Sequence, residues 1–342
     1  MKAYVVRGPS QGATEHVAEP VAGPGEAVAV VERVGLCGTD RELFEGAMLE
    51  LHQGQDAYPL RLGHEWVGRV ESTGPGVGPE WLGRRVTGDC MIGCGHCGLC
   101  RRGAHYVCPD RLEVGVRGRD GALAERLVLP VSSLIAVPEE LTAAAGAMIE
   151  PGGNAWRAVD AAQASPSGNV LIWGAGTIGL LCVMFAKAAG SEVEVVARRQ
   201  ASAEAAERAG ADRIWQPDEV PRAGGANWNG YSAVIEASGA ASAPGRCAMS
   251  VEPGGRLVLI GVAGQASLID TRHLVTNDIT AIGILGGSLG LRPALAAYGS
   301  RDVIPDSLVS QVISLDQVSQ AFAAVTGQPK PGAPKVQVNP SL

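Results

Sequence analysis

Short apolar runs separated by glycine and proline dominate the first part of the chain. Glu26–Val34, Trp66–Thr73 and Leu127–Pro130 are rich in valine, leucine and other apolar residues. Runs of this length, bounded by turn residues, predict β-strands. We therefore expect residues 1–140 to form a β-rich unit with many loops.

The pattern changes at Leu141–Ala162, an alanine-rich stretch that predicts a helix. From there, strand-like and helical patterns alternate, which predicts βαβ units and a parallel sheet. The predicted strands are Asn169–Trp173, Glu192–Ala197, Ala233–Glu236, Arg256–Val262 and Ile279–Ile284, with helices at Ile178–Ala189 and Ala201–Ala209. Weakly amphipathic helices near Pro293–Gly299 and Leu315–Val325 precede a polar tail, and we expect this last segment to return to the first unit.

Composition and charge exclude several classes of protein. With 342 residues, 46% of them hydrophobic and 18% charged, the chain suits a globular protein of two domains. Its net charge is −7, and no basic run exceeds two residues, which argues against a nucleic-acid partner. The N-terminus lacks the apolar core of a signal peptide, and no apolar run is long enough for a membrane span. We expect a cytoplasmic protein with no membrane partner.

A cluster of cysteines has metal-ligand spacing. The pattern C-x2-C-x2-C-x7-C brings four cysteines within fifteen residues: Cys94, Cys97, Cys100 and Cys108. Four thiolates close a tetrahedral shell around Zn²⁺ and leave no position open for a substrate. In a reducing compartment, clustered cysteines favour metal binding over disulfides. The spacing predicts a structural zinc site.

A glycine-rich turn follows the predicted strand Asn169–Trp173. It has the pattern G-x-G-x-x-G and consists of Gly174, Ala175, Gly176, Thr177, Ile178 and Gly179. Between a strand and a helix, this pattern is typical of dinucleotide binding, because the helix N-terminus receives the pyrophosphate. The next strand ends at Ala197, Arg198 and Arg199 instead of the acidic residue typical of NAD sites. Since arginine binds phosphate well, we predict that the protein prefers NADP over NAD.

Further candidate metal ligands come from separate segments of the chain. Cys37 lies in a glycine-flanked loop, His64 and Glu65 follow Gly63, and Glu150 lies where the β-rich unit ends. Cysteine, histidine and a carboxylate can form a catalytic zinc site with an open position. Spacing alone is equally compatible with His64 as a core histidine and Cys37 as an inert thiol.

These motifs together resemble the zinc-dependent medium-chain dehydrogenases, the alcohol dehydrogenase superfamily. The segment Gly63-His64-Glu65-x2-Gly68-x5-Gly74-x2-Val77 matches the zinc signature of that family, and the remaining motifs occur in the expected order. The resemblance implies a GroES-like catalytic domain (residues 1–145 and 288–342, with a zinc lobe at 90–110) and a Rossmann domain (146–287). It further implies that Cys37 and His64 bind a catalytic zinc, with Glu65 and Glu150 as further ligand positions. Two Zn²⁺ per chain are expected.

Within this family, the chain is most similar to the sugar and polyol branch. The segments Cys37–Glu42 and Ala197–Arg199 resemble those of microbial glucose dehydrogenases that use NADP, and Glu113 lies where those enzymes place a sugar-binding acid. Cys90, where those enzymes have asparagine, and the segment Glu150–Asn154 depart from that pattern. Glu113, Cys90 and Asn154 are therefore candidate substrate residues. Polyol, cyclitol and aminocyclitol dehydrogenases remain open.

The resemblance also implies a mechanism, which is hydride transfer between an alcohol carbon and the nicotinamide. Thr39 would hydrogen-bond the substrate oxygen and pass on its proton. Many relatives complete this relay with a histidine five residues after the zinc cysteine, but here that position is Glu42, and His52 is a possible substitute. Further cofactor contacts are expected at Ser238, Gly261, Val262 and Leu285. The strand at Ile279–Ile284 would pair with its copy in a homodimer or homotetramer.

Two rival functions stand beside an NADP-dependent sugar or polyol dehydrogenase. The first is a simple secondary-alcohol dehydrogenase, or a carbonyl or enone reductase, of the same fold. The second belongs to another class: a catalytically idle NADPH-binding protein. The presence of Cys37, His64, Glu65 and Glu150 together argues against the idle protein.

Overall fold

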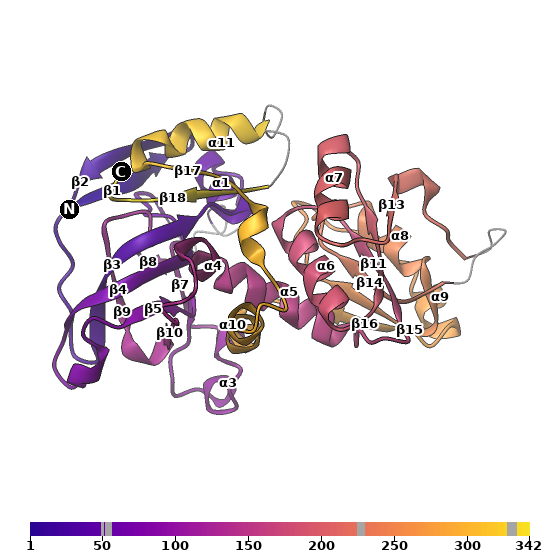
Figure 1. Ribbon diagram of the computed structural model, residues 1–342, viewed down its shortest axis with the longest axis horizontal. Coiled ribbons are helices and arrows are strands. Elements are labelled where there is room, and N and C mark those ends of the chain that lie inside the picture. The colour runs from indigo at the N-terminus through magenta and orange to yellow at the C-terminus, as the bar shows by residue number, and fades with distance from the viewer. Residues whose placement is uncertain (49–50, 52–56, 224–229, 327–333) are drawn as a thin grey trace. The chain divides into compact units, whose positions relative to one another are not determined.

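A computed structural model describes residues 1–48, 51, 57–223, 230–326 and 334–342 (Figure 1). The chain divides into two compact units. The first unit comprises Met1–Glu150, Pro305–Lys330 and Lys335–Leu342, and the second comprises Pro151–Ile304 and Pro331–Pro334. The domain limits expected at residues 145/146 and 287/288 stay a prediction.

A largely antiparallel sheet forms the framework of the first unit. Its strand order is β10-β5-β4-β3-β18-β17, and β9 pairs with β3 outside this path. The strands are β3 (Glu26–Gly35), β4 (Glu65–Thr73), β5 (Arg85–Gly88), β9 (Arg126–Pro130), β10 (Leu134–Ala136), β17 (Val309–Ile313) and β18 (Lys335–Val338). Separately, β1 (Lys2–Gly8) pairs with β2 (Gln11–His16). The strands predicted at β3, β4 and β9 are confirmed.

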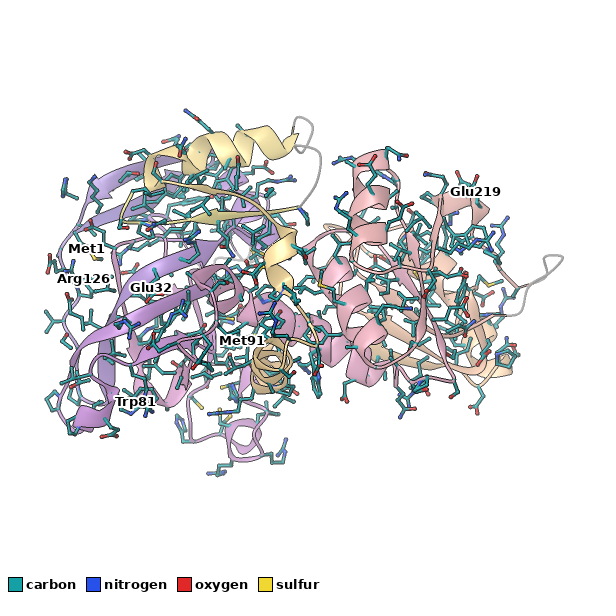
Figure 2. All side chains as sticks on the ribbon, in the orientation of Figure 1. Met1, Glu32, Trp81, Met91, Arg126 and Glu219 are labelled. Atoms are coloured by element: carbon teal, nitrogen blue, oxygen red, sulfur yellow. The ribbon has the colours of Figure 1, made fainter. Side chains whose placement is uncertain are left out.

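Short elements complete the first unit around this framework. They are α1 (Gly38–Glu45), η1 (Pro79–Trp81), β6 (Met91–Ile92), α3 (Gly98–Arg101), η2 (His105–Val107), β7 (Leu112–Val114), β8 (Gly118–Arg119), η3 (Val131–Ser133), η6 (Pro305–Leu308) and η7 (Leu315–Gln317). Strands β6, β7 and β8 form a small sheet of their own. Figure 2 labels Met91 on β6, and this side chain belongs to the buried core of the unit.

The end of the chain belongs to the core of the first unit. Strand β18 lies in the expected polar tail, where the sequence predicted no strand, and it pairs with both β3 and β17. Helix α11 (Val318–Thr326) packs against β1, since the Tyr4 hydroxyl lies 2.7 Å from Ser319 Oγ and the Tyr4 and Phe322 rings meet edge to face. The C-terminal segment therefore completes the sheet that begins near the N-terminus.

A parallel sheet in the order β13-β12-β11-β14-β15-β16 forms the second unit and confirms the predicted βαβ architecture. The strands are β11 (Asn169–Trp173), β12 (Glu192–Val196), β13 (Arg213–Trp215), β14 (Tyr231–Glu236), β15 (Val251–Leu259) and β16 (Thr280–Gly283). The helices are α6 (Thr177–Ala188), α7 (Gln200–Arg208), η4 (Pro217–Glu219), α8 (Ala243–Ala248), α9 (Thr271–Thr276), η5 (Ser288–Gly290) and α10 (Leu291–Gly299). Figure 1 shows α6 and α7 on one side of this sheet and α8 and α9 on the other. The strand order reverses between β11 and β14, and such a switch point is where ligands bind in open parallel sheets.

The single helix expected at Leu141–Ala162 is wrong. The structure has α4 (Ala143–Ala147) and α5 (Ile149–Ala161), separated at Met148. Pro151 explains the break, because its ring would clash with the Ala147 carbonyl four residues earlier in a continuous helix. In the first turn of a new helix, the missing proline N–H costs nothing. Glu150 consequently lies at the start of α5.

Among the residues that the structure describes, no helix combines the length and the apolar character that crossing a bilayer requires.

Candidate functional site

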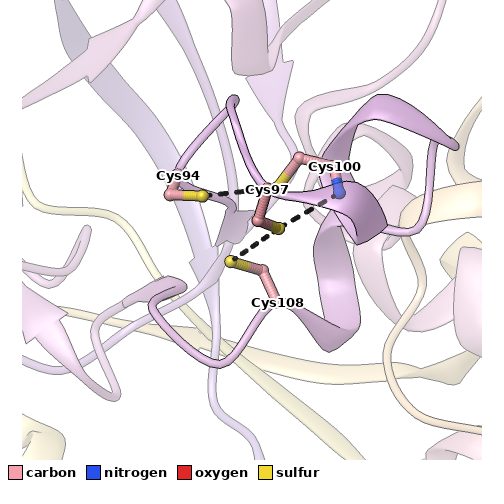
Figure 3. A group of neighbouring side chains, drawn as sticks. All are labelled: Cys94, Cys97, Cys100 and Cys108. Carbon is pink, nitrogen blue, oxygen red and sulfur yellow. Dashed lines mark hydrogen bonds between the residues drawn. The ribbon is translucent and has the colours of Figure 1, made fainter.

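The four clustered cysteines lie close together in the first unit (Figure 3). The Sγ atoms of Cys94 and Cys100 are 3.9 Å apart, and those of Cys97 and Cys108 are 3.8 Å apart. A tetrahedron with Zn–S bonds of about 2.3 Å has sulfur–sulfur edges of about 3.8 Å. The spacing fits four thiolates around one zinc ion and is far too long for disulfide bonds.

Backbone groups favour the thiolate form of two of these cysteines, Cys94 and Cys97. Cys97 is the N-cap of α3, and its sulfur accepts a hydrogen bond from the Cys100 backbone N–H at 3.4 Å. This hydrogen bond is the largest of several that lower the pKa of Cys97 to about 6, whereas burial raises the pKa of Cys100 to about 12. The loop is tightly packed, because a Cβ at Gly93 would come within 2.7 Å of the Cys100 sulfur. The cysteine lobe is thus preformed for a cation.

A second group of ligand atoms comes from separate segments of the chain. One ligand atom from each of Cys37, His64 and Glu65 lies within 4.8 Å of the others. Cys37 is the N-cap of α1, Glu65 is the first residue of β4, and His64 directly precedes that strand. His64 and Glu65 are buried. A thiolate, an imidazole and a carboxylate are ligands that Zn²⁺ accepts in catalytic sites.

Asp40 ties these ligands together, a role that the sequence pattern did not reveal. Its carboxylate accepts hydrogen bonds from the backbone N–H groups of Cys37 at 2.9 Å and Gly63 at 3.0 Å. It also lies 3.5 Å from His64 Nδ1. Burial lowers the pKa of His64, but the Asp40 carboxylate and the Cys37 sulfur together outweigh burial and raise that pKa well above its ordinary value. Asp40 therefore fixes the spacing of the two segments that carry the ligands.

Lys335 is a second residue whose role the sequence pattern did not reveal. Its ammonium donates to both carboxylate oxygens of Glu65, at 2.6 and 2.8 Å, and to the Leu36 carbonyl at 3.0 Å. Burial lowers the pKa of Lys335, yet Glu65, Cys37 and Asp40 together outweigh burial, and the pKa is raised. A lysine in a polar tail carries no signal in a single sequence that would place it beside Glu65. The ion pair therefore engages both carboxylate oxygens of Glu65.

Glu150 lies with other predicted residues rather than within the Cys37 group. In the described part of the chain, the ligand set within 4.8 Å comprises Cys37, His64 and Glu65. Glu150 is buried and accepts a long hydrogen bond of 3.6 Å from Cys90 Sγ. Burial, reinforced by the Glu150, Asp89 and Glu113 carboxylates, raises the pKa of Cys90 well above its ordinary value. The structure therefore brings Cys90, Glu113 and Glu150 together around a neutral thiol.

The predicted proton-relay residues Thr39 and Glu42 lie on α1, and the candidate substrate residue Asn154 lies on α5. Thr39 is half-buried in the first turn of α1, and the exposed Glu42 follows three residues later, on the same face of the helix. Asn154 is half-buried on α5, in the second unit. His52 lies outside the described residues.

The glycine turn of the second unit has the geometry of a dinucleotide site. Gly174 has a φ of +111°, which L-residues with a side chain avoid, and a Cβ at Gly179 would collide with the Gly174 carbonyl. Gly176 caps α6, and a Cβ there would meet nothing within 4 Å. The backbone N–H groups at the start of α6, which include Thr177 and Ile178, are thus open to a pyrophosphate.

The remaining predicted cofactor residues follow the carboxyl ends of neighbouring parallel strands. Ala197 is buried after β12, whereas Arg198 and Arg199 are exposed. Ser238 follows β14, and its backbone N–H donates to Glu236 at 2.8 Å. Gly261 and the exposed Val262 follow β15, and Leu285 follows β16. Because all of these strands run parallel, these residues lie along the same edge of the sheet as Gly174.

A dinucleotide-type sheet together with a mixed cysteine, histidine and carboxylate group defines a class of oxidoreductase that uses a nicotinamide cofactor and zinc. Residues 23–139 match the family described as "Alcohol dehydrogenase GroES-like domain", and residues 177–298 match "Zinc-binding dehydrogenase". The chain belongs to the zinc-type medium-chain dehydrogenases, the alcohol dehydrogenase family. The predicted GroES-like and Rossmann architecture is confirmed.

Individual relatives agree with this membership. The L-threonine 3-dehydrogenase of Chelativorans sp. strain BNC1 is 30% identical over 335 residues, which cover 95% of each chain. A putative zinc-binding dehydrogenase from Sinorhizobium meliloti 1021, solved bound to NADP, has 29% identity and a TM-score of 0.90 over 99% of each chain. An alcohol dehydrogenase from Escherichia coli CFT073, solved with NADH, has 25% identity and the same TM-score and coverage. The chain is therefore a dehydrogenase of the alcohol or polyol type.

Proposed function

We propose that the chain is a zinc-dependent dehydrogenase that transfers a hydride between NADP(H) and the secondary alcohol or ketone of a sugar, polyol or cyclitol. The observation that carries the proposal is the Cys37, His64 and Glu65 group, with ligand atoms within 4.8 Å of one another. Three mixed ligands leave a position for a substrate oxygen, whereas the four-cysteine group is closed. The closed group would hold a second, structural Zn²⁺, giving two zinc ions per chain.

The chain's own residues have separable roles in this proposal. When bound, zinc supplies Lewis acidity at the substrate oxygen, and the nicotinamide carries the hydride. Cys37 and His64 would hold the ion, and Asp40 orients both through its hydrogen bond to the Cys37 backbone and its contact with His64. Glu65 would be a further ligand, oriented by its hydrogen bonds from Lys335.

The proton and the substrate need polar partners near this group. Thr39, two residues after Cys37, would hydrogen-bond the substrate hydroxyl and pass its proton on. Glu42 is the proposed next acceptor, since it shares a face of α1 with Thr39. Cys90, Glu113 and Asn154 would contact the substrate, and Glu150 would ligate zinc when it leaves Cys90. The carboxylates beside Cys90 suit a substrate rich in hydroxyl groups, because carboxylates accept hydrogen bonds from hydroxyls.

The cofactor preference is proposed from the end of β12. Arg198 and Arg199 are exposed, and Ala197 stands where an acidic residue would repel a 2′-phosphate. The solved neighbours include one bound to NADP and one complexed with NADH, so the preference for NADP depends on these arginines. The remaining contacts are proposed at the glycine turn, Ser238, Gly261, Val262 and Leu285.

A second candidate substrate is a β-hydroxy amino acid. Several curated relatives are L-threonine 3-dehydrogenases, among them the Pyrococcus horikoshii protein, which is 35% identical over 278 residues. Threonine carries a secondary alcohol, so the same hydride transfer would apply. A simple secondary-alcohol dehydrogenase, a carbonyl reductase and a catalytically idle NADPH-binding protein stay open until substrates are compared directly.

We further propose a homodimer or homotetramer in the cytoplasm. Strand β16 lies at the edge of its sheet in the described part of the chain. Its residues are mostly exposed, as are the nearby apolar side chains of Leu268 and Val275. An open edge with apolar surroundings favours pairing with a second copy. A site of four reduced cysteines fits a reducing compartment.

A substrate panel tests the proposal. Sugars, polyols, cyclitols, L-threonine and simple alcohols would each be offered with NADP and with NAD, and formation of the reduced cofactor would be followed by absorbance. We expect turnover of a polyhydroxylated alcohol with NADP, lost in Cys37→Ser and retained in Cys182→Ala, a buried cysteine outside both metal groups. Turnover of L-threonine alone would favour the second candidate. Cofactor binding without turnover of any member would favour the idle protein.

A further inference from the structure

Arg157 makes a contact in the second unit that the proposed mechanism does not use. This half-buried residue lies on α5, and its Nη1 donates to two consecutive backbone carbonyls, Leu285 at 2.6 Å and Gly286 at 2.5 Å. Hydrogen bonds from a charged donor are stronger than neutral ones. A single guanidinium therefore fixes the orientation of two successive peptide groups in the loop after β16.

The same face of α5 holds the loop at a second point. Gly153 precedes Arg157 by four residues, so both lie on one face of the helix. A Cβ at Gly153 would come within 2.7 Å of the Gly287 carbonyl, and a Cβ at Gly290 would collide with the Gly153 carbonyl. The loop is thus pressed against α5 at its end and bound to Arg157 at its beginning.

Holding the carbonyls also orients the amides. In a trans peptide, C=O and N–H point in opposite directions, so fixing the Leu285 and Gly286 carbonyls turns the N–H groups of Gly286 and Gly287 away from Arg157. Gly286 is left-handed, with a φ of +67°, and Gly287 is right-handed, with a φ of −89°. Successive N–H groups in such a turn form a concave site for an oxygen atom. The described hydrogen bonds give neither amide an acceptor within the protein.

The topology places this loop on the nicotinamide side of the proposed cofactor site. The glycine turn follows β11, and Arg198 follows β12, on one side of β11 in the sheet. If the adenosine half lies toward β12, the second half of the dinucleotide extends toward the carboxyl ends of β14, β15 and β16. The loop from Leu285 to Gly287 leaves the last of these strands.

We propose that Arg157 is a positioning residue that holds the Leu285–Gly287 loop so that its amides receive the carboxamide oxygen of the nicotinamide. This inference rests on the proposed cofactor. Arg157 touches neither cofactor nor substrate in this role, but acts through the backbone that it anchors. Its loss would let the loop rotate its peptide groups and would weaken binding of the nicotinamide half alone.

Two ligands separate the nicotinamide half from the rest of the cofactor. NADPH contains both halves, whereas 2′,5′-ADP contains only the adenosine half with its phosphates. Titration of the full chain with each ligand would compare wild type with Arg157→Met and Arg157→Lys. We expect Arg157→Met to weaken NADPH binding about tenfold, the loss of one or two neutral hydrogen bonds, and to leave 2′,5′-ADP binding unchanged. Arg157→Lys, which retains a donor, would be intermediate.

Arg256 offers a matched control in the same unit. Its Nη1 also donates to a backbone carbonyl of α5, that of Ala161 at 3.2 Å, but Arg256 lies three residues before the carboxyl end of β15. Arg256→Met should change neither affinity. Equal weakening of both ligands in Arg157→Met, or an NADPH affinity within about twofold of wild type, would overturn the inference. If the wild-type chain binds neither ligand, the proposed cofactor fails together with the inference.

Discussion

Lys335 and Glu65 form a buried ion pair between residues 270 positions apart, with Nζ–Oε distances of 2.6 and 2.8 Å. Lys335 is 2% exposed and Glu65 is 1% exposed. Strand β3 lies between the β18 and β4 strands that carry them. Glu65 also belongs to the group with Cys37 and His64. Strand β18 therefore places the positive charge of Lys335 beside a candidate metal site.

Removing the lysine should destabilise the protein strongly. Lys335→Met leaves the Glu65 carboxylate buried without its cation, and such single truncations typically cost about 3–5 kcal/mol. The double variant Lys335→Met with Glu65→Gln removes both charges and should recover most of this loss. Urea unfolding of the metal-free protein would measure the cycle. A loss below about 1 kcal/mol in Lys335→Met, the range of a solvated surface pair, would contradict the prediction.

Local patterns predicted the parts of the site that depend on local geometry. The Cys94–Cys108 spacing sufficed for the cysteine lobe, because the ligands come from one short loop. The glycine turn was predictable for the same reason, since Gly174 and Gly179 act within one strand–turn–helix unit. In both cases, the residues that meet the steric requirement lie within one short segment of the sequence.

Long-range partners were not predictable from one sequence. Lys335 reaches Glu65 only because β18 joins the sheet beside β3, and β18 is a short strand of mixed polarity in an apparently polar tail. The break before α5 had a local signal in Pro151, which the alanine-rich composition around it obscured. Glu150 and Cys90 meet through tertiary packing, and their residue types alone do not predict this contact.

Metal content should respond differently to the two cysteine groups. We predict that wild type binds two zinc ions per chain, that Cys100→Ser loses the lobe zinc, and that Cys37→Ser loses the zinc of the Cys37 group. Cys100→Ser should also lower the unfolding temperature, because zinc that binds only the folded lobe stabilises it. Elemental analysis of protein purified with zinc present would give the counts, with Cys247→Ala as the control outside both groups. Two ions retained in Cys100→Ser would contradict the lobe assignment.

The two arginines after β12 should decide the cofactor preference. Hydrogen bonds to charged groups contribute about 1.5–3 kcal/mol each, so Arg198→Ala with Arg199→Ala should weaken NADP binding by about 100-fold or more. Binding of NAD, which lacks the 2′-phosphate, should change little. Calorimetric titration with both cofactors measures the ratio, and Arg208→Ala, at the far end of α7, is the control. Equal losses of affinity for NAD and NADP would mean that the arginines do not bind the 2′-phosphate.

The Lys187–Asp212 pair should make the stability of the second unit sensitive to acid. Asp212 accepts hydrogen bonds from Lys187 Nζ at 2.8 and 2.9 Å and from the Val193 backbone N–H at 2.7 Å, which lower the pKa of Asp212. A pKa that is lower in the folded state stabilises the fold above the unfolded value of about 3.9. This stabilisation is lost as the pH falls through the folded-state pKa.

Asp212→Asn tests the sign of this linkage. Both side chains are about a third exposed, 34% for Lys187 and 39% for Asp212, so screening limits the expected loss near neutral pH to about 0.5–1 kcal/mol. The difference in urea midpoint between wild type and variant should shrink below about pH 4, where the aspartate becomes protonated in the unfolded chain. Lys187→Met, which removes the opposite charge, should show the same pH dependence. A difference that stays constant from neutral to acidic pH would mean that packing of the side chain, rather than its charge, stabilises this end of β12.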